Sequence, residues 1–145
     1  MKLSALYQIF LDCQSVTTDS RNCPDGSLFI ALKGESFNGN AFAKLALDSG
    51  CAFAIIDEIQ YAVEGDQRYI LVDDCLQTMQ QLANYHRRQL GTRVIGITGT
   101  NGKTTTKELI SSVLCQAHNV LYTLGNLNNH IGVPTLSLIH ISEPT

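Results

Sequence analysis

The segment "TGTNGKTTTKE", residues 98–108, places a glycine-rich turn between an apolar run and a stretch with helical periodicity. Residues 93–98, "RVIGIT", predict a buried strand before the turn, and residues 119–122, "NVLY", predict a second strand further on. Between them, residues 103–117 predict a helix whose buried face carries Leu109, Ile110, Val113 and Leu114. This order indicates the first β-loop-α-β unit of a P-loop ATPase module.

The turn has the composition of a phosphate-binding loop. The first amides of a helix lack intrahelical acceptors and the helix dipole is positive there, so a helix that begins at Lys103 attracts an anion. Gly99 and Gly102 let the backbone approach phosphate oxygens, the lysine reaches the β- and γ-phosphates, and the Thr104 hydroxyl ligates magnesium. We therefore predict ATP and Mg²⁺ as cofactors, Lys103 and Thr104 as catalytic residues, Thr104 as the metal ligand, and a nucleotide loop made of Gly99, Thr100, Asn101, Gly102, Lys103, Thr104 and Thr105.

The loop departs from the strict nucleotide-binding pattern at one position. That pattern has a glycine five residues before Gly102, where this chain has Ile97. The alternative interpretation is that "GTNG" is an ordinary turn. The succession of strand, loop, Gly-Lys-Thr and helix favours nucleotide binding, whereas Lys107 and Glu108 are predicted to be solvated helix residues.

Residues 1–91 predict a separate α/β module. Apolar strands are predicted at 27–32 ("SLFIAL"), 51–57 ("CAFAIID") and 69–72 ("YILV"), with helices at 3–11, 40–50 and 73–90. Alternating strands and helices predict a parallel sheet with helical crossovers. The buried helix faces are predicted to carry Phe42, Leu45 and Ala46 in the second helix, and Leu76, Met79, Leu82, Ala83 and Leu90 in the third, with His86 near the helix end complementing the dipole.

Composition limits the possible functions. The chain has 145 residues, of which 44% are hydrophobic and 16% charged, so it can bury a core. Its net charge of −3 argues against a nucleic-acid partner. There is no run of eighteen apolar residues and no signal peptide, so we expect no membrane association. Five cysteines without metal-ligand spacing predict free thiols in a reducing cytoplasm.

Three ordered motifs resemble the Mur ligases, the ATP-dependent amide-forming enzymes of bacterial peptidoglycan precursor synthesis. These are "GITGTNGKTTTKE" (96–108), "GNLNNHIGVP" (125–134), and "TTDSRNCPDGSLFIALKGESFNGNAFA" (17–43), which is similar to the uridine-binding module of the family. The resemblance covers residues 1 to about 134. "GNLNNHIGVP" looks most like the branch that adds D-alanyl-D-alanine to UDP-N-acetylmuramoyl-tripeptide through an acyl-phosphate.

The resemblance implies a domain organisation and further site residues. Residues 1–91 would form the UDP-sugar-binding module, and residues 92–134 would begin the ATPase domain. Asp19, Ser20 and Arg21 match the segment near the uridine diphosphate, while Asn126, Asn128 and Asn129 match the loop that faces the muramoyl-peptide. The family's frequent Asp and His in D-G-H-x-F are Asn38 and Asn40 here, so a charge-based role at those positions is in doubt.

Several alternatives stay open. Asp19 and Arg21 could form a local ion pair on a turn, and the three asparagines could be turn residues. The parent could be another ligase, either the sister enzyme that adds the third peptide residue or a folylpolyglutamate-like ligase, although the Asn-Asn-x-Ile-Gly segment disfavours both. Residues 1–91 could also be a non-catalytic nucleotide-sugar-binding module.

The last eleven residues do not fit the family pattern. "TLSLIHISEPT", residues 135–145, resembles translated sequencing-adapter text, so we expect this tail to be non-native. The chain is accordingly expected to be an N-terminal fragment that is inactive by itself.

Overall fold

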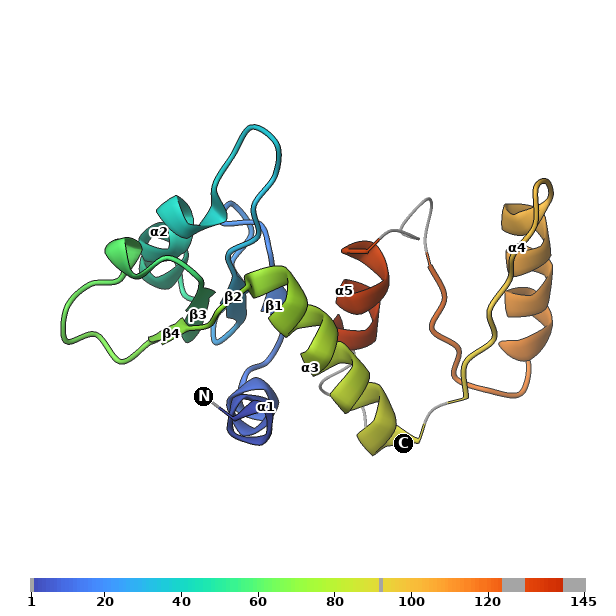
Figure 1. Cartoon of the computed structure of the whole chain (residues 1–145). Coiled ribbons are helices and arrows are strands. Elements are labelled where there is room, and N and C mark those ends of the chain that lie inside the picture. The colour runs from blue at the N-terminus through green and yellow to red at the C-terminus, as the bar shows by residue number, and fades with distance from the viewer. Residues whose placement is uncertain (1, 92, 124–129, 140–145) are drawn as a thin grey trace.

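A computed structural model describes residues 2–91, 93–123 and 130–139 (Figure 1). The first module is built on a four-stranded sheet in which all neighbouring strands are parallel and lie in the order β1-β2-β3-β4. The strands are β1 (Val16–Thr17), β2 (Leu28–Ile30), β3 (Phe53–Ile56) and β4 (Tyr69–Leu71). The predicted α/β class and parallel sheet are confirmed. The short strand β1 was missed, because "VTTDS" lacks the apolar run that identified the others.

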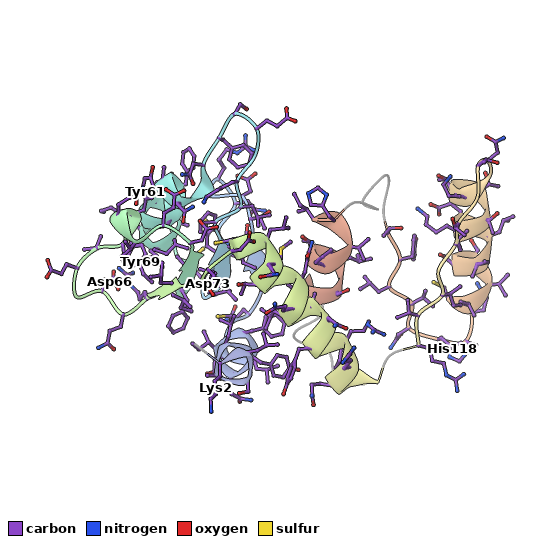
Figure 2. The ribbon with its side chains drawn as sticks, in the orientation of Figure 1. Lys2, Tyr61, Asp66, Tyr69, Asp73 and His118 are labelled. Atoms are coloured by element: carbon purple, nitrogen blue, oxygen red, sulfur yellow. The ribbon has the colours of Figure 1, made fainter. Side chains whose placement is uncertain are left out.

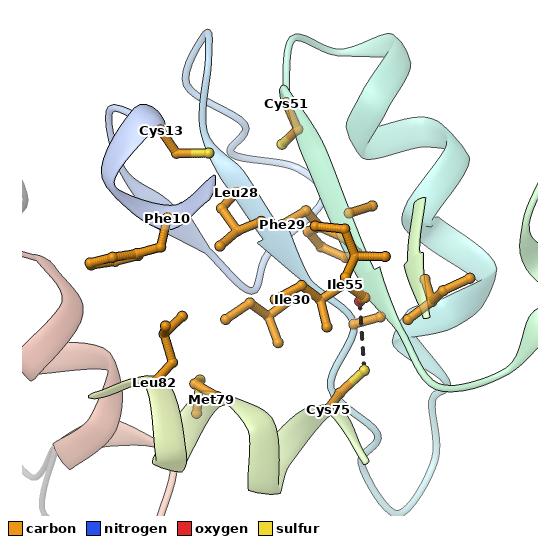
Figure 3. Close-up of a cluster of buried hydrophobic side chains, with 14 of the residues drawn as sticks. Phe10, Cys13, Leu28, Phe29, Ile30, Cys51, Ile55, Cys75, Met79 and Leu82 are labelled. Atoms are coloured by element: carbon orange, nitrogen blue, oxygen red, sulfur yellow. Dashed lines mark hydrogen bonds between the residues drawn. The ribbon is translucent and has the colours of Figure 1, made fainter. Parts of the chain in front are cut away.

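Helices and single turns connect and cover these strands. They are α1 (Leu3–Asp12), η1 (Gly39–Phe42), α2 (Ala43–Asp48), η2 (Ile59–Tyr61), α3 (Cys75–Leu90), α4 (Lys103–Leu114) and α5 (Gly132–Ile139). Leu28 and Ile30 of β2 point toward α1 and α3, where Phe10, Met79 and Leu82 meet them (Figure 3). These five side chains are fully buried and form the centre of the core.

The ends of α3 follow directly from its sequence. Asp74 precedes the helix, and its carboxylate accepts a hydrogen bond from the Gln77 N–H at 2.7 Å, which satisfies one of the free amides of the first turn. Gly91 follows the last turn with φ of 62°, a left-handed conformation in which a Cβ would be strained. The helix therefore begins and ends within two residues of the predicted limits.

Two predicted helix faces were partly wrong. In α2 the buried residues are Ala43, Ala46 and Leu47, whereas Phe42 and Leu45 are exposed. The helix is preceded by the 3-10 turn η1, whose tighter winding rotates the register of the residues that follow. In α3 the buried face ends at His86, so that Leu90 lies in solvent beyond the sheet.

His86 lies in the core of the first module. Its ring is buried between α1 and α3, and its Nδ1 lies 3.1 Å from the Tyr7 hydroxyl. The Phe10 ring meets the imidazole edge-on at a centroid distance of 4.9 Å. His86 thus packs in the core, and the predicted interaction with the helix dipole stays a prediction.

The second segment is much less buried than the first. Residues 93–98 and 119–122, predicted as strands, carry no strand in the structure. Leu109 and Val113 of α4 are exposed, the latter by 71%, whereas Ile110 and Leu114 are half-buried, so the predicted buried face of this helix was wrong in part. Figure 1 shows α4 standing apart from the sheet. Two strands alone form a marginal sheet in water, which accounts for the absence of the predicted β-loop-α-β packing among the described residues.

Helix α5 returns to the first module. It packs against α3 and β1, and its Leu138 side chain is 0% exposed. The Thr135 hydroxyl contacts the Met79 sulfur at 3.9 Å, and the Gln80 amide donates to the His130 carbonyl at 3.1 Å. Residues that follow α4 in the chain therefore complete the core of the module that precedes it.

Among residues 2–91, 93–123 and 130–139, no helix combines the length and apolar character that crossing a bilayer requires.

Candidate functional site

The glycine-rich loop opens α4 with the backbone geometry that the sequence predicts. Gly99 has φ of 153° and Gly102 has φ of 76°, both in the region that favours glycine. The first intrahelical bond runs from the Thr106 N–H to the Gly102 carbonyl at 2.9 Å. The amides of Lys103, Thr104 and Thr105 therefore have no acceptor within the helix, and they open toward the loop.

Lys103 lies across this loop. Its Nζ donates to the carbonyl oxygen of Gly99, so that the ammonium stands beside the first amides of α4. Residues 99–106 are exposed, and a Cβ placed on Gly102 would meet no other atom within 4 Å. The loop is an open cradle with one cation and several free N–H groups, and this donor set fits an anionic phosphate.

Lys107 is not the solvated residue that the sequence predicted. Its Nζ donates to the Thr123 carbonyl at 2.5 Å and lies 3.1 Å from the Glu108 carboxylate. It also lies 5.9 Å from the centre of the Tyr122 ring. Lys107 thus ties the segment that returns from α4 to the helix itself.

A second group of polar residues lies at the opposite end of the chain, in loops that follow β1, β2 and β3. The carboxyl ends of parallel strands meet at one edge of the sheet, which is where open α/β sheets bind ligands. Asp19, Ser20 and Arg21 follow β1. The Arg21 guanidinium donates to both Asp19 oxygens, from Nε at 2.9 Å and from Nη2 at 2.8 Å.

This pair is local, as the alternative interpretation of the sequence proposed. Hydrogen bonds from the Arg21 side chain and backbone hold the pKa of Asp19 down at about 2. The Arg21 side chain is 86% exposed, so its guanidinium stays accessible to an anion while it is oriented by the carboxylate. Ser20 lies beside the pair, half-buried, and its carbonyl accepts a weak bond from the Cys23 thiol at 3.4 Å.

Asn38 and Asn40 have a structural role at the same edge. Asn40 is buried, and its amide donates to the Asn38 side chain and to the Asp57 carboxylate, each at 2.8 Å. The Asp57 carboxylate also accepts the Lys33 ammonium at 2.9 Å, and Lys33 reaches Glu58 at 2.8 Å. These neutral amides therefore complete a charged network.

Lys33, Asp57 and Glu58 were not among the predicted site residues. The signal was present, because Asp57 ends the predicted strand 51–57 and Glu58 follows it, at the sheet edge where polar loops gather. Asp57 also accepts the Cys75 N–H at 3.2 Å, at the start of α3. One carboxylate thus connects the ends of β2 and β3 to a helix N-terminus.

A shallow hollow lies beside β4. Its volume is about 340 Å³, and it is bordered beside β4 by Ile56, Leu71, Asp66 and Tyr69, the last two of which are labelled in Figure 2. The Arg68 guanidinium holds the Asp66 carboxylate at 2.7 Å. None of the predicted site residues lines this hollow.

The structure brings Gly99–Thr105 together in one loop and Asp19–Arg21 together in another. Asn126, Asn128 and Asn129 lie outside the described residues. Within the described part of the chain, no three histidine, cysteine or carboxylate side chains converge as a ready-made metal site. Of the predicted metal ligands, Thr104 is present with an exposed hydroxyl at the start of α4.

Comparisons with known proteins identify the family to which this chain is related. Residues 12–87 match a family model described as "Mur ligase family, catalytic domain", and residues 97–141 match "Mur ligase middle domain". A UDP-N-acetylmuramoyl-tripeptide--D-alanyl-D-alanine ligase of Bacillus subtilis is 46% identical over 90% of this chain, and that of Escherichia coli is 41% identical over 83%. This chain spans only 28% and 26% of those two relatives.

Solved structures of similar sequence share the fold. MurF of Acinetobacter baumannii matches 88% of this chain with a TM-score of 0.79 and 38% identity, and the match covers 27% of that protein. The MurF ligase of Thermotoga maritima, solved in complex with ADP, matches 90% of this chain with a TM-score of 0.79 and 30% identity, and 30% of that chain is covered.

Proposed function

Because the chain belongs to the Mur ligase family, we propose that it is the N-terminal part of an ATP-dependent ligase that joins D-alanyl-D-alanine to UDP-N-acetylmuramoyl-tripeptide. The observation that supports the ATP-dependent part is the open glycine loop at the start of α4, with Lys103 lying across it. The choice of amide product rests on relatives that carry that name at 33–46% identity.

In this proposal, bound ATP supplies the phosphoryl group that turns the peptide carboxylate into an acyl phosphate, from which the dipeptide amine displaces phosphate to form the amide. The first amides of α4 hold the phosphate oxygens, and the Lys103 ammonium neutralises charge that builds up on them. The Thr104 hydroxyl is the ligand that this chain offers to Mg²⁺. These residues position the nucleotide and stabilise charge.

The first module binds the uridine diphosphate part of the acceptor. Arg21 is the exposed cation at the carboxyl edge of the sheet, and Asp19 fixes its direction through two hydrogen bonds. A planar guanidinium suits bidentate contact with phosphate oxygens. Asn126, Asn128 and Asn129 are proposed to face the muramoyl-peptide, on the resemblance of "GNLNNHIGVP" alone.

The full reaction is assigned to the longer parent protein. This chain spans 28% of the B. subtilis relative, so we propose that it binds nucleotides without turning over substrates. We further propose that the parent acts in the cytoplasm, where UDP-linked precursors are made, and that residues 135–145 are not native. A clean genomic sequence that encodes those eleven residues would contradict the last point.

Calorimetric titration of the 145-residue chain tests the proposal. Mg²⁺-ATP and a UDP-sugar should bind at separate sites, Lys103→Met should weaken the first at least tenfold, and Arg21→Gln should weaken only the second. Lys44→Met is the matched control, because Lys44 is an exposed lysine paired with Asp48 on α2, away from both loops. Binding of UDP-sugar without ATP would favour a non-catalytic sugar-nucleotide module, and binding of neither would sink the proposal.

A further inference from the structure

The connection between β3 and β4 is unusual for a parallel sheet. Parallel strands are normally joined by a crossover helix that covers one face of the sheet. Between residues 57 and 68, all of which the structure describes, the chain forms only the single turn η2 and a loop that Figure 1 shows projecting beyond the sheet. This connection therefore supplies no helix to cover the β4 end of the sheet.

The side chains left open at this end belong to one face of the sheet. Ile56 lies opposite Leu71 in the register of β3 and β4, and Tyr69 lies two residues before Leu71. Because side chains alternate across a strand, these three point to the same face. Ile55 and Ile70 point to the other face, which α1 and α3 cover. Leu71 thus points away from those helices, and its side chain is 46% exposed.

The hollow beside β4 lies on this open face. Its volume is about 340 Å³, and Ile56, Tyr69 and Leu71 border it on the side of the strands. Ile59 and Val63 border it on the side of the loop, and they are 64% and 45% exposed. A contiguous group of exposed apolar side chains is typical of a surface that another molecule covers.

β4 also has an unused hydrogen-bonding edge, because it is the last strand of the sheet. The ladder to β3 uses the Arg68 carbonyl and the Val72 N–H, each in a bond of 2.9 Å. Backbone groups alternate in direction along a strand, so the N–H and the carbonyl of Leu71 point away from β3. Among the described residues, neither group has a backbone partner. The edge is therefore open to a further strand.

The charges around the hollow select the kind of strand that fits. Glu64 borders the hollow and Asp73 follows β4, and both carboxylates are exposed (Figure 2 labels Asp73). Asp66 is held by Arg68, whereas Glu64 and Asp73 form no ion pair with any described residue. A second copy of this chain would bring the same two carboxylates against them, so charge repulsion disfavours a dimer at this edge and favours a basic partner.

We propose that β4 is a docking edge for an extended, basic and apolar segment of another protein. The segment adds to the sheet as a further strand and bonds to the N–H and carbonyl of Leu71. One large apolar side chain enters the hollow. Asp73 lies two residues beyond Leu71, about 6.7 Å along the strand, so a lysine or arginine two positions from that apolar residue faces it. This inference does not depend on nucleotide binding.

The test measures the binding of two fluorescent synthetic peptides of equal composition to the full chain by anisotropy. In the first peptide, lysines stand two positions before and after a leucine, with serines between them, so that all three long side chains share one face. In the second, the lysines are moved next to the leucine and point to the opposite face. The first peptide should bind about tenfold more tightly, because only its leucine and lysines reach the hollow and the carboxylates together.

Variants of the chain test each contact separately. Leu71→Ala should weaken binding of the first peptide about tenfold, since it removes apolar contact in the hollow. Leu11→Ala is the matched control, because Leu11 is 41% exposed on α1, and it should leave binding unchanged. Glu64→Gln together with Asp73→Asn should weaken binding and remove most of its dependence on salt. Circular dichroism confirms that each variant is folded.

The first peptide with N-methyl groups on its serines and leucine tests the backbone contacts, because it keeps every side chain and loses N–H donors. It should bind about tenfold more weakly. Equal binding of the methylated or the rearranged peptide would overturn strand addition at β4, and so would a failure of the unaltered chain to bind the first peptide. A dimer of the unaltered chain in sedimentation velocity that Leu71→Ala abolishes would assign this edge to a second copy and overturn the proposal of a basic partner.

Discussion

Asn40 and Asp57 exchange two hydrogen bonds: the Asn40 amide donates to the Asp57 carboxylate at 2.8 Å, and its oxygen accepts the Asp57 N–H at 3.0 Å. Asn40 follows β2 and Asp57 follows β3, so this pair joins the carboxyl ends of two neighbouring strands. The family resemblance places a frequent histidine at Asn40. In this chain a neutral amide is sufficient, because the charge at this edge is supplied by Lys33, Asp57 and Glu58.

Asn40→Ala should destabilise the first module by about 2–3 kcal/mol. The change removes hydrogen bonds to a largely buried carboxylate, and such bonds are worth more than neutral ones. Urea unfolding followed by circular dichroism measures the difference. Asn84→Ala on the exposed side of α3 is the control, with an expected change below about 0.5 kcal/mol. If the two changes lowered the free energy of unfolding equally, the hydrogen bonds between Asn40 and Asp57 would not contribute measurably to stability.

The acid sensitivity of the fold should depend on Lys33. Burial raises the pKa of Asp57, but hydrogen bonds from Lys33, Asn40 and the Cys75 N–H outweigh it and leave that pKa below its ordinary value of 3.8. A carboxylate with a lowered folded-state pKa stabilises the fold above the unfolded-state value, and that contribution is lost as pH falls through the folded-state value.

Lys33→Met should therefore lower stability at pH 7 and lose less additional stability between pH 5 and pH 2 than the unaltered chain. Urea midpoints across that range give the comparison. Asp19 and Asp66 also have pKa values that are lowered by hydrogen bonds from arginines. They titrate in both proteins, so their contributions cancel when the two pH profiles of stability are compared. Parallel pH profiles for the two proteins would refute a role for Lys33 in this dependence.

Gly102→Ala should weaken Mg²⁺-ATP binding and leave the stability of the first module unchanged. The φ of 76° costs an alanine about 1–2 kcal/mol, which displaces the amides at the start of α4, yet nothing within 4 Å of the new Cβ couples this strain to the core. Gly65→Ala is a matched control, with φ of 83° and equally open surroundings in another loop. If Gly65→Ala reduced ATP affinity as much, the effect could not be assigned to the phosphate loop.

Leu138→Asp should destabilise the first module by about 3 kcal/mol or more, because it places a charge in a fully buried apolar site. Val133→Asp, on the same helix at a position that is 48% exposed, should change stability by less than about 0.5 kcal/mol. Hydrogen exchange of the α3 amides measures the loss of stability in the part of the helix against which α5 packs. Unaltered exchange in Leu138→Asp would mean that α5 is dispensable for this core.

The fold of the first module could be predicted from sequence because its signals are local. Apolar runs marked three strands, and Asp74 and Gly91 marked the limits of α3. What could not be predicted depends on partners distant in sequence. His86 is buried because Tyr7 and Phe10 of α1 lie over it, and α5 packs on α3 with Leu138 fully buried and Thr135 against Met79.

The candidate sites also differ in whether their residues are close together in the sequence. The phosphate loop has its residues within seven consecutive positions, so the sequence alone located it. The network at the sheet edge joins Lys33, Asn40 and Asp57 from three separate segments, and only the parallel order of the strands brings them together. The predicted strands around α4 failed for a related reason, since a strand needs neighbours that lie elsewhere in the fold.

The strand order β1-β2-β3-β4 is also the order of synthesis. As the chain leaves the ribosome, each new strand finds its neighbour already translated, so the sheet can grow by one edge without waiting for later sequence. Leu138 is the exception, because it enters this core from a point almost fifty residues beyond Gly91. In this chain the side of α3 that α5 covers is therefore the last part of the core to be enclosed, and a parent protein without residues 135–145 would have to cover it with other residues.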